Sequence, residues 1–252
     1  MTLGRFILKI LAIDTSGLQA GAAIVCGDNS SYITIGEITL NARTGSKSFT
    51  HSEILMPAIE QLFLLTRLEA RDVDYIAYTN GPGSFTGLRI GASSALALGY
   101  ALNKPTIAVP TLDALAYNMI NAGEEANIIP MLDARRGQIY TAIYKRNGEG
   151  KITRTTDFLA LEASTFLKNQ SSLKNTCVIT LGDGADENYN VIKEFLPNAN
   201  FAKLNNNRQR ASSVGAWAIE KISEGLLPSE NVEILYVREP QAVREREKKC
   251  IR

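Results

Sequence analysis

Length, composition and charge place the chain among ordinary globular proteins. Its 252 residues are 45% apolar and 21% charged, a balance that excludes a disordered or fibrous protein. The 27 lysines and arginines and 26 aspartates and glutamates leave a net charge of +1, which argues against binding nucleic acid through bulk charge. Cys26, Cys177 and Cys250 are too dispersed for a disulfide framework or a metal-binding pair, so we expect a reducing, cytoplasmic location.

The first half of the chain alternates strands with helices. Residues 7–13 are an apolar segment that Lys9 interrupts and Asp14 ends, which indicates a buried strand rather than a signal peptide. Thr50 and Glu53 fit a capping box at the start of a helix. The further elements that we expect are strands at 20–25 and 32–40, a helix from His51 kinked at Pro57, a strand at 75–79, a glycine loop at 80–87, a helix at 88–102, a strand at 105–109 and a helix at 111–121. This alternation predicts α/β layers around a largely parallel sheet.

The pattern at the start of the chain returns in its second half. Residues 11–25 align without a gap with residues 130–144, so that Asp14 meets Asp133. Each copy is an apolar strand that ends in Asp, followed by a tight turn and a strand that returns antiparallel. The elements expected after the second copy are a helix at 161–168, a strand at 177–181 and helices at 185–195 and 211–224. The repetition predicts two similar lobes, residues 1–123 and 124–252.

The turn that follows the first strand, Asp14-Thr15-Ser16-Gly17, has two interpretations. Hydroxyls and backbone N–H groups there would hold phosphate while the carboxylate orients a hydrated magnesium ion. Alternatively, Asp14 only caps a hairpin turn. We favour the cap, because the second copy, Asp133-Ala134-Arg135-Arg136, has no hydroxyl side chain.

The glycine loop at residues 80–87 is a second candidate site. It lacks the Gly-Lys-Ser/Thr ending of a Walker A loop. A helix N-terminus with Ser84, Thr86 and Arg89 nearby would still attract an anion. Equally, Gly81, Gly83 and Gly87 permit a tight chain crossing. The sequence leaves both interpretations open.

His51 and a stripe of small residues complete the candidates. His51 is the only histidine of the chain, which excludes a catalytic zinc site with its three or so protein ligands. A lone histidine in the first turn of a helix is usually a surface or capping residue, so we expect no histidine-based triad. Gly91, Ala95 and Gly99 recur every four residues, which favours close packing, on the protein's own sheet or on a partner helix.

Two other stretches carry no function of their own. The apolar residues 87–102 include Arg89 and are shorter than the ~20 residues that cross a bilayer, so we expect no membrane contact. Residues 244–252 are a run of mixed charge, which is typical of a solvated helix end rather than an RNA-binding arm.

Five segments together resemble one bacterial family. They are IDTS at 13–16, HSEIL at 51–55, NGPGSFTGLRIG at 80–91, LDARRGQIY at 132–140 and ILYVRE at 234–239. Over residues 8–239 the chain resembles the TsaB (YeaZ) family, most specifically in GPGSFTGLR. The resemblance implies a duplicated, two-lobed actin/sugar-kinase-like fold (ASKHA, ribonuclease H-like). It also implies a relationship to TsaD, the catalytic subunit that makes N6-threonylcarbamoyladenosine (t6A) in tRNA.

The resemblance implies a non-catalytic subunit that binds and activates a TsaD-like transferase. TsaD-like proteins hold a metal with two histidines four residues apart, where this chain has His51 and Leu55. The chain would therefore have no metal or cofactor of its own, and ATP and the metal would belong to partner subunits. A TsaE-like ATPase would join the assembly, and tRNA would bind only within the complex. The isolated chain would be able to form a homodimer.

The two first-lobe helices are where the resemblance implies that the transferase binds. The interface residues expected on them are Leu55, Ile59, Leu62, Gly91, Ala95 and Gly99. The competing hypothesis is a self-sufficient magnesium-dependent nucleotide hydrolase or small-molecule kinase. It would use Asp14, Thr15 and the loop at 81–87, with Ser84 and Thr86 as further candidates.

Overall fold

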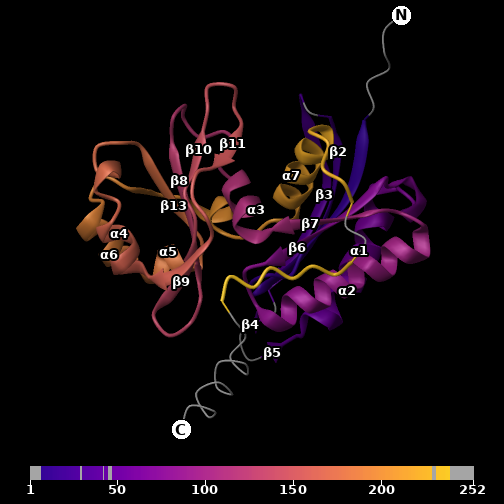
Figure 1. Ribbon diagram of the computed structural model, residues 1–252. Coiled ribbons are helices and arrows are strands. Elements are labelled where there is room, and N and C mark those ends of the chain that lie inside the picture. Colours follow the sequence, from indigo (N-terminus) through magenta and orange to yellow (C-terminus); the bar gives the residue numbers. More distant parts are fainter. Residues whose placement is uncertain (1–6, 29, 42, 45–46, 229–230, 239–252) are drawn as a thin grey trace, which may run out of the picture.

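Two α/β lobes lie side by side in the computed structural model of the protein (Figure 1). The structure describes residues 7–28, 30–41, 43–44, 47–228 and 231–238. The mixed-charge run at 244–252 and Cys250 lie outside the described residues.

The first lobe is built on a five-stranded sheet. Its strands are β1 (Leu8–Asp14), β2 (Gln19–Gly27), β3 (Tyr32–Asn41), β6 (Tyr75–Gly81) and β7 (Thr106–Pro110), in the order β3-β2-β1-β6-β7. The first three strands pair antiparallel, and β6 and β7 continue the sheet in parallel. Short turns suffice for the antiparallel part, whereas each parallel pairing needs a crossover helix. A separate two-stranded ribbon joins β4 (Arg43–Thr44) and β5 (Lys47–Ser48).

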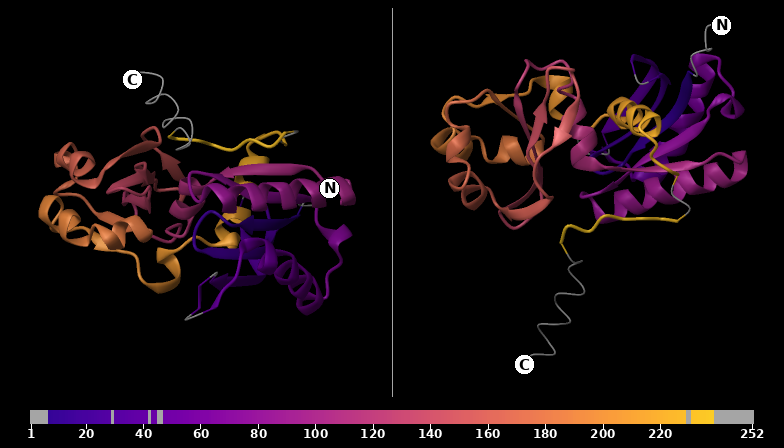
Figure 2. Two further views of the ribbon diagram at one scale, coloured as in Figure 1. Left: turned by 90° about the horizontal axis from the view of Figure 1, so that it is seen from below. Right: turned by 45° about the horizontal axis from the view of Figure 1, so that its top comes forward.

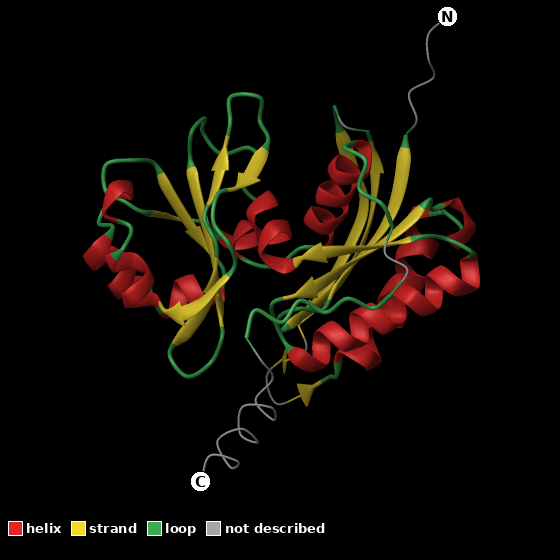
Figure 3. Ribbon diagram, viewed as in Figure 1, coloured by secondary structure: helices red, strands yellow, loops and turns green. Residues whose placement is uncertain are grey.

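Helices cover both faces of this sheet (Figure 3). On one face, α1 (His51–Thr66) and α2 (Phe85–Leu102) pack on the apolar side chains of β1, β2 and β6. On the other face lie α3 (Thr111–Tyr117) and α7 (Ala211–Ser223). Because both faces are covered, β1 is almost wholly buried, which explains why its sequence is continuously apolar.

The second lobe repeats this plan in a reduced form. Its strands are β8 (Asn127–Asp133), β9 (Gln138–Thr141), β10 (Tyr144–Arg146), β11 (Ile152–Arg154), β12 (Leu159–Glu162), β13 (Val178–Leu181) and β14 (Asn200–Phe201). The order is β11-β10-β8-β13-β14, and β9 pairs with β8 and β12. The helices of this lobe are α4 (Ala163–Lys168), α5 (Asp183–Glu187) and α6 (Tyr189–Phe195).

The predicted division at residue 123 is wrong for the last part of the chain. Helix α7 returns to the first lobe, where it packs on β1 and β2. The Glu37 carboxylate on β3 accepts a hydrogen bond from the Ser212 backbone N–H at 3.0 Å and forms a 2.6 Å ion pair with Arg210. The first lobe is therefore assembled from two separate stretches of sequence.

Most expected elements are present, with shifted ends. The capping box of Thr50 and Glu53 begins α1, which continues through Pro57 as a helix. Helix α2 starts at Phe85 rather than at residue 88, because the Ser84 hydroxyl caps it by accepting from the Gly87 N–H. The helix expected at 185–195 is two helices that meet at Asn188. Among the described residues, no helix is both long and apolar enough to span a membrane.

Candidate functional site

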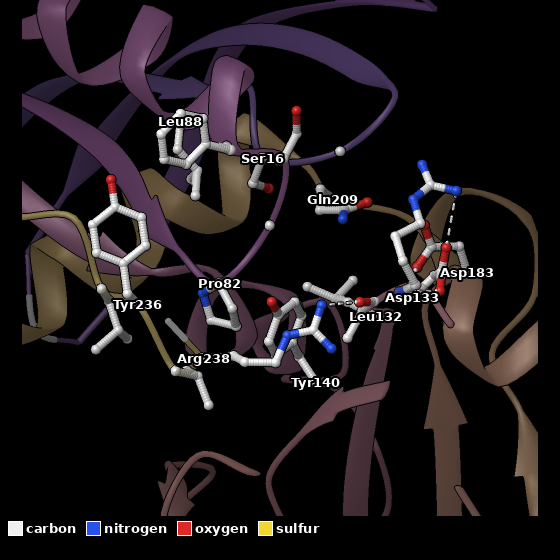
Figure 4. A pocket seen from close by; sticks show the side chains of 18 of the residues that line it. Ser16, Pro82, Leu88, Leu132, Asp133, Tyr140, Asp183, Gln209, Tyr236 and Arg238 are labelled. Atoms are coloured by element: carbon white, nitrogen blue, oxygen red, sulfur yellow. Dashed lines mark hydrogen bonds and ion pairs between the residues drawn. The ribbon is translucent and has the colours of Figure 1, made fainter. Parts of the chain in front are cut away.

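A cavity of about 570 Å³ lies between the two lobes. Both repeated hairpin turns line it, together with the glycine loop and the segment that follows α7 (Figure 4). The lining residues shown there include Ser16, Pro82, Leu132, Asp133, Tyr140, Asp183, Gln209, Tyr236 and Arg238. A ligand bound in this cavity would therefore contact both copies of the repeated hairpin turn.

The two repeated aspartates cap their turns in the same way. The Ser16 N–H donates to Asp14 Oδ1 at 2.9 Å, and the Arg135 N–H donates to Asp133 Oδ1 at 2.7 Å. Both are bonds from residue i+2 back to the side chain of residue i, the pattern of an Asx turn. The capping role favoured from the sequence is therefore present in both lobes.

Asp14 lies behind its turn rather than in the cavity. Only 4% of the residue is exposed, and it is absent from the cavity lining. Its Oδ1 also accepts hydrogen bonds from the hydroxyls of Ser16, at 2.7 Å, and Thr79, at 3.3 Å. Burial raises the pKa of Asp14 above its ordinary value although these hydrogen bonds act to lower it. Such a carboxyl is poorly suited to orient a hydrated cation.

The first turn and the glycine loop pack directly on each other. The Thr15 hydroxyl donates to the Gly87 carbonyl at 2.8 Å, and the Ser84 N–H donates to the Ser16 carbonyl at 2.7 Å. A Cβ atom at Gly87 would lie 2.1 Å from the Thr15 carbonyl oxygen. The contact accounts for glycine at position 87 without any ligand, and it occupies two donors that the phosphate hypothesis needs, the Thr15 hydroxyl and the Ser84 N–H.

Three candidates lie near the start of α2 with different surroundings. The Ser84 hydroxyl accepts from the Gly87 N–H at 3.2 Å. Thr86 is exposed, and it does not line the cavity. The Arg89 guanidinium stacks on the Phe85 ring, 3.9 Å from its centroid. Only Ser84 of these three is part of the cavity wall.

His51 takes part in an internal contact. Its Nε2 lies 3.0 Å from the Gly17 carbonyl oxygen, which links the start of α1 to the first hairpin turn. Leu55, one helical turn further on, is 1% exposed and points into the core. The described part of the chain contains no cluster of three His, Cys, Asp or Glu residues that could hold a metal.

The six expected interface residues lie inside the first lobe, and this corrects the prediction. Leu55, Ile59 and Leu62 belong to the core that α1 shares with the sheet. Gly91, Ala95 and Gly99 are buried as well. A Cβ at Gly91 would lie 2.2 Å from Thr15 Oγ1, and one at Gly99 would lie 2.8 Å from Thr106 Cγ2. The small residues let α2 approach its own strands and turn, so a partner would meet other side chains.

The second half of the chain contributes residues that the sequence did not single out for a role. The Asp183 carboxylate accepts from the backbone N–H groups of Asp133, at 3.0 Å, and Gly184, at 2.9 Å. Gln209 is 8% exposed and packs against Gly17. Tyr236 and Arg238 fall in the ILYVRE segment, whose resemblance to the family marked it without indicating a position in space. No local signal in the sequence brings these residues to one cavity.

Comparison with known proteins now decides the family. A family model described as TsaD, tRNA N6-adenosine threonylcarbamoyltransferase, matches residues 46–206. The chain belongs to this TsaD-type family. Its relatives include TsaB from Bacillus subtilis, 37% identical over 144 residues, and TsaB from Escherichia coli, 30% identical over 143 residues. Both are named tRNA threonylcarbamoyladenosine biosynthesis proteins, which confirms the resemblance to TsaB.

The matches to these relatives are partial. The aligned residues make up 56% of this chain and 57% of the B. subtilis protein, and 57% and 58% in the E. coli comparison. The chain therefore spans little more than half the length of the curated relatives that it matches.

Solved structures show the fold of this family member. YeaZ from Pseudomonas aeruginosa superposes with a TM-score of 0.68 at 21% identity, covering 91% of this chain and 99% of that chain. A ROK hexokinase from Thermus thermophilus superposes with a TM-score of 0.51 at 12% identity, covering 86% and 100%. The two-lobed actin/sugar-kinase-like fold expected from the sequence is confirmed.

Proposed function

We propose that the chain is a non-catalytic subunit of tRNA t6A modification that binds and activates a TsaD-like transferase, together with a TsaE-like ATPase. Membership of the family and the names of the TsaB relatives support a role in t6A biosynthesis. One observation carries the non-catalytic part of the proposal. The groups that would hold phosphate in an ATPase of this fold are used within the chain: the Thr15 hydroxyl donates to the glycine loop, and the Ser16 hydroxyl and N–H donate to Asp14.

The partner surface that we propose is the outer side of α1 and α2. These helices cover the same face of the first sheet, and their outward sides carry large apolar side chains. The exposed fractions are 45% for Met56, 67% for Leu64 and 72% for Leu65 on α1, and 45% for Phe85 and 92% for Tyr100 on α2. A contiguous patch of exposed apolar side chains marks a site of protein association, and we infer that those of α1 and α2 form such a patch.

Activation requires that the chain prefer one state of the transferase. A protein that binds only the active conformation of its partner shifts the population toward that conformation. The chain would need no cofactor of its own for this role. ATP and a metal ion would be bound by the partner subunits, and tRNA would be bound by the assembled complex.

Two matched substitutions test the partner surface. Leu64→Asp should weaken binding to the transferase by at least about tenfold. Burying an unpaired carboxylate in an apolar interface costs more than the binding free energy of about 1.4 kcal/mol that corresponds to a tenfold change in affinity. Leu227→Asp is the control: Leu227 is 82% exposed and lies four positions after the end of α7, which covers the opposite face of the sheet. Isothermal titration calorimetry gives both affinities. Equal affinities for the two variants would contradict the proposed surface.

The same variants test self-association. If the isolated chain forms a homodimer through the outer side of α1 and α2, Leu64→Asp should produce monomer and Leu227→Asp should not. Sedimentation velocity distinguishes these outcomes.

A further inference from the structure

The last described segment of the chain crosses from the first lobe to the second. Residues 231–238, here called the C-terminal strap, run beside α2 and end near the turn between β8 and β9 (Figures 1 and 2). Four of these residues, 235–238, form one wall of the cavity between the lobes. The strap is therefore both part of the first lobe and part of the boundary with the second.

Backbone and core contacts fix the strap to the first lobe. The Leu235 N–H donates to the Asn80 carbonyl, at the end of β6, at 2.8 Å. Ile234 packs against the core that α1 and α2 share with the sheet. A Cβ at Gly81 would lie 2.6 Å from the Leu235 carbonyl oxygen, so glycine at this position lets the strap approach.

An aromatic contact extends this attachment to the first turn of α2. The rings of Tyr236 and Phe85 have centroids 6.0 Å apart at an interplanar angle of 34°. The Arg89 guanidinium lies over the Phe85 ring and donates to the Tyr236 hydroxyl at 3.4 Å. These contacts attach the strap to the first lobe as far as Tyr236, two positions before Arg238.

Arg238 reaches across to the second lobe. Its guanidinium donates one hydrogen bond to the Gln138 side-chain oxygen. It donates another, at 2.8 Å, to the Ala134 carbonyl (Figure 4). Both acceptors belong to the turn between β8 and β9 or to its edge. Hydrogen bonds from a charged donor are stronger than those between neutral groups, and a planar guanidinium holds two acceptors in a fixed geometry.

A second connection between the lobes runs through α3, away from the strap (Figure 1). Helix α3 packs against both β6 and β8. The Tyr144 hydroxyl of β10 donates to the Asp113 carboxylate of α3 at 2.6 Å, and Arg146 Nε donates to the Ile120 carbonyl at 2.7 Å. The lobes also share an apolar core around α3 and α7, and ion pairs join Lys151 to Glu224 at 3.1 Å and Asp186 to Arg208 at 2.6 Å. The strap is a further link, at the side of the cavity away from α3 (Figure 1).

We propose that the C-terminal strap is a clasp that fixes the spacing of the two lobes across the cavity, with Arg238 as the fastening residue. Release of Arg238 lets the second lobe move away from the strap, while the apolar core that both lobes share around α3 and α7 stays intact. The width of the cavity on the strap side is then set by one side chain at the end of a first-lobe segment. This inference is independent of the proposed role in tRNA modification.

Distance measurement between spin labels in the two lobes tests the clasp. One label is placed on Cys177, which is exposed in the second lobe, and the other on the exposed α2 position through Ser93→Cys. Cys26→Ser and Cys250→Ser remove the other thiols. In this parent protein, pulsed electron paramagnetic resonance should give one narrow distance distribution. Arg238→Ala should broaden it at least twofold.

The control is Arg71→Ala, which removes an arginine whose 2.8 Å ion pair with Glu69 lies within the first lobe. This variant should reproduce the narrow distribution of the parent. If Arg238→Ala does not fold, Gln138→Ala removes one acceptor of the same contact and should broaden the distribution to a smaller extent. A distribution for Arg238→Ala, or for its Gln138→Ala substitute, that coincides with that of the parent would overturn the proposal.

Discussion

Asp14 is the residue on which the catalytic and structural interpretations differ most. A catalytic carboxylate would face the cavity and stay ionised, whereas Asp14 is buried and caps its own turn. Its Oδ2 atom has no hydrogen-bond partner among the described residues. Keeping this group ionised and buried costs free energy.

Asp14→Asn tests this interpretation through the pH dependence of stability. Because the folded-state pKa is raised, the stabilising contribution of protonated Asp14 is fully present below the unfolded pKa of about 3.9 and is lost as pH rises through the folded pKa. Asparagine keeps the Oδ1 acceptor and stays neutral. Relative to wild type, the variant should therefore gain unfolding free energy as pH rises from 4 to 8, by about 1.4 kcal/mol per unit by which the pKa is raised.

Urea unfolding of both proteins across this pH range measures the difference. A difference that stays constant or shrinks with rising pH would contradict the assignment. The competing hydrolase hypothesis makes its own prediction for the same variant: magnesium-dependent nucleotide turnover by the isolated chain, abolished in Asp14→Asn.

Gly91 shows how a small residue serves the chain's own packing. Gly91→Ala should lower the unfolding free energy by about 1–3 kcal/mol, because the added Cβ would lie 2.2 Å from Thr15 Oγ1. Alanine is otherwise the better helix former by about 1 kcal/mol, so a net loss isolates the clash. Gly123→Ala, with no atom within 4 Å of its new Cβ, should stay within about 0.5 kcal/mol of wild type. Equal urea midpoints for both variants would contradict this account of the stripe.

The helices show what periodicity in a sequence can and cannot assign. Apolar spacing predicted α1, and the capping box located its first residue. The same spacing did not distinguish the core side from a partner side, because α1 carries apolar residues on both. Leu62 is 2% exposed while its neighbours in the sequence, Leu64 and Leu65, are largely exposed. Burial depends on where the sheet lies, and this is a long-range property.

Tight turns were the most predictable part of the candidate site. An Asp at the end of an apolar strand bonds to a backbone N–H two residues on, so local sequence is enough to predict the cap. Packing of the glycine loop on that turn was not predictable. Thr15 and Gly87 are 72 positions apart, and only the pairing of β1 with β6 brings them together.

For the whole molecule, the internal repeat predicted two lobes but not their composition. The shared pattern at residues 11–25 and 130–144 gives both lobes a strand hairpin. It contains no information on α7, which returns to the first sheet, or on the strap that follows. The position of α7 depends on contacts such as that of Glu37 with Arg210, 173 positions apart in the sequence, and that of the strap on contacts such as the hydrogen bond from Leu235 to Asn80.

Two features of the whole molecule, the cavity between the lobes and the outer side of α1 and α2, bear on the proposed function. The turn of the first lobe that borders the cavity uses its Thr15 hydroxyl to bond the glycine loop, while the outer side of α1 and α2 carries exposed apolar side chains. In the proposed function, this fold would act by binding a partner rather than by turning over nucleotide.

Reconstitution of t6A formation tests this central claim most directly. A TsaD-like transferase, a TsaE-like ATPase, ATP, a threonylcarbamoyl donor and tRNA are combined with and without this chain, and the modified adenosine is measured by mass spectrometry. We expect product only when the chain is present, with less product for Leu64→Asp than for Leu227→Asp. Equal amounts of product with and without the chain would contradict its role as the activating subunit.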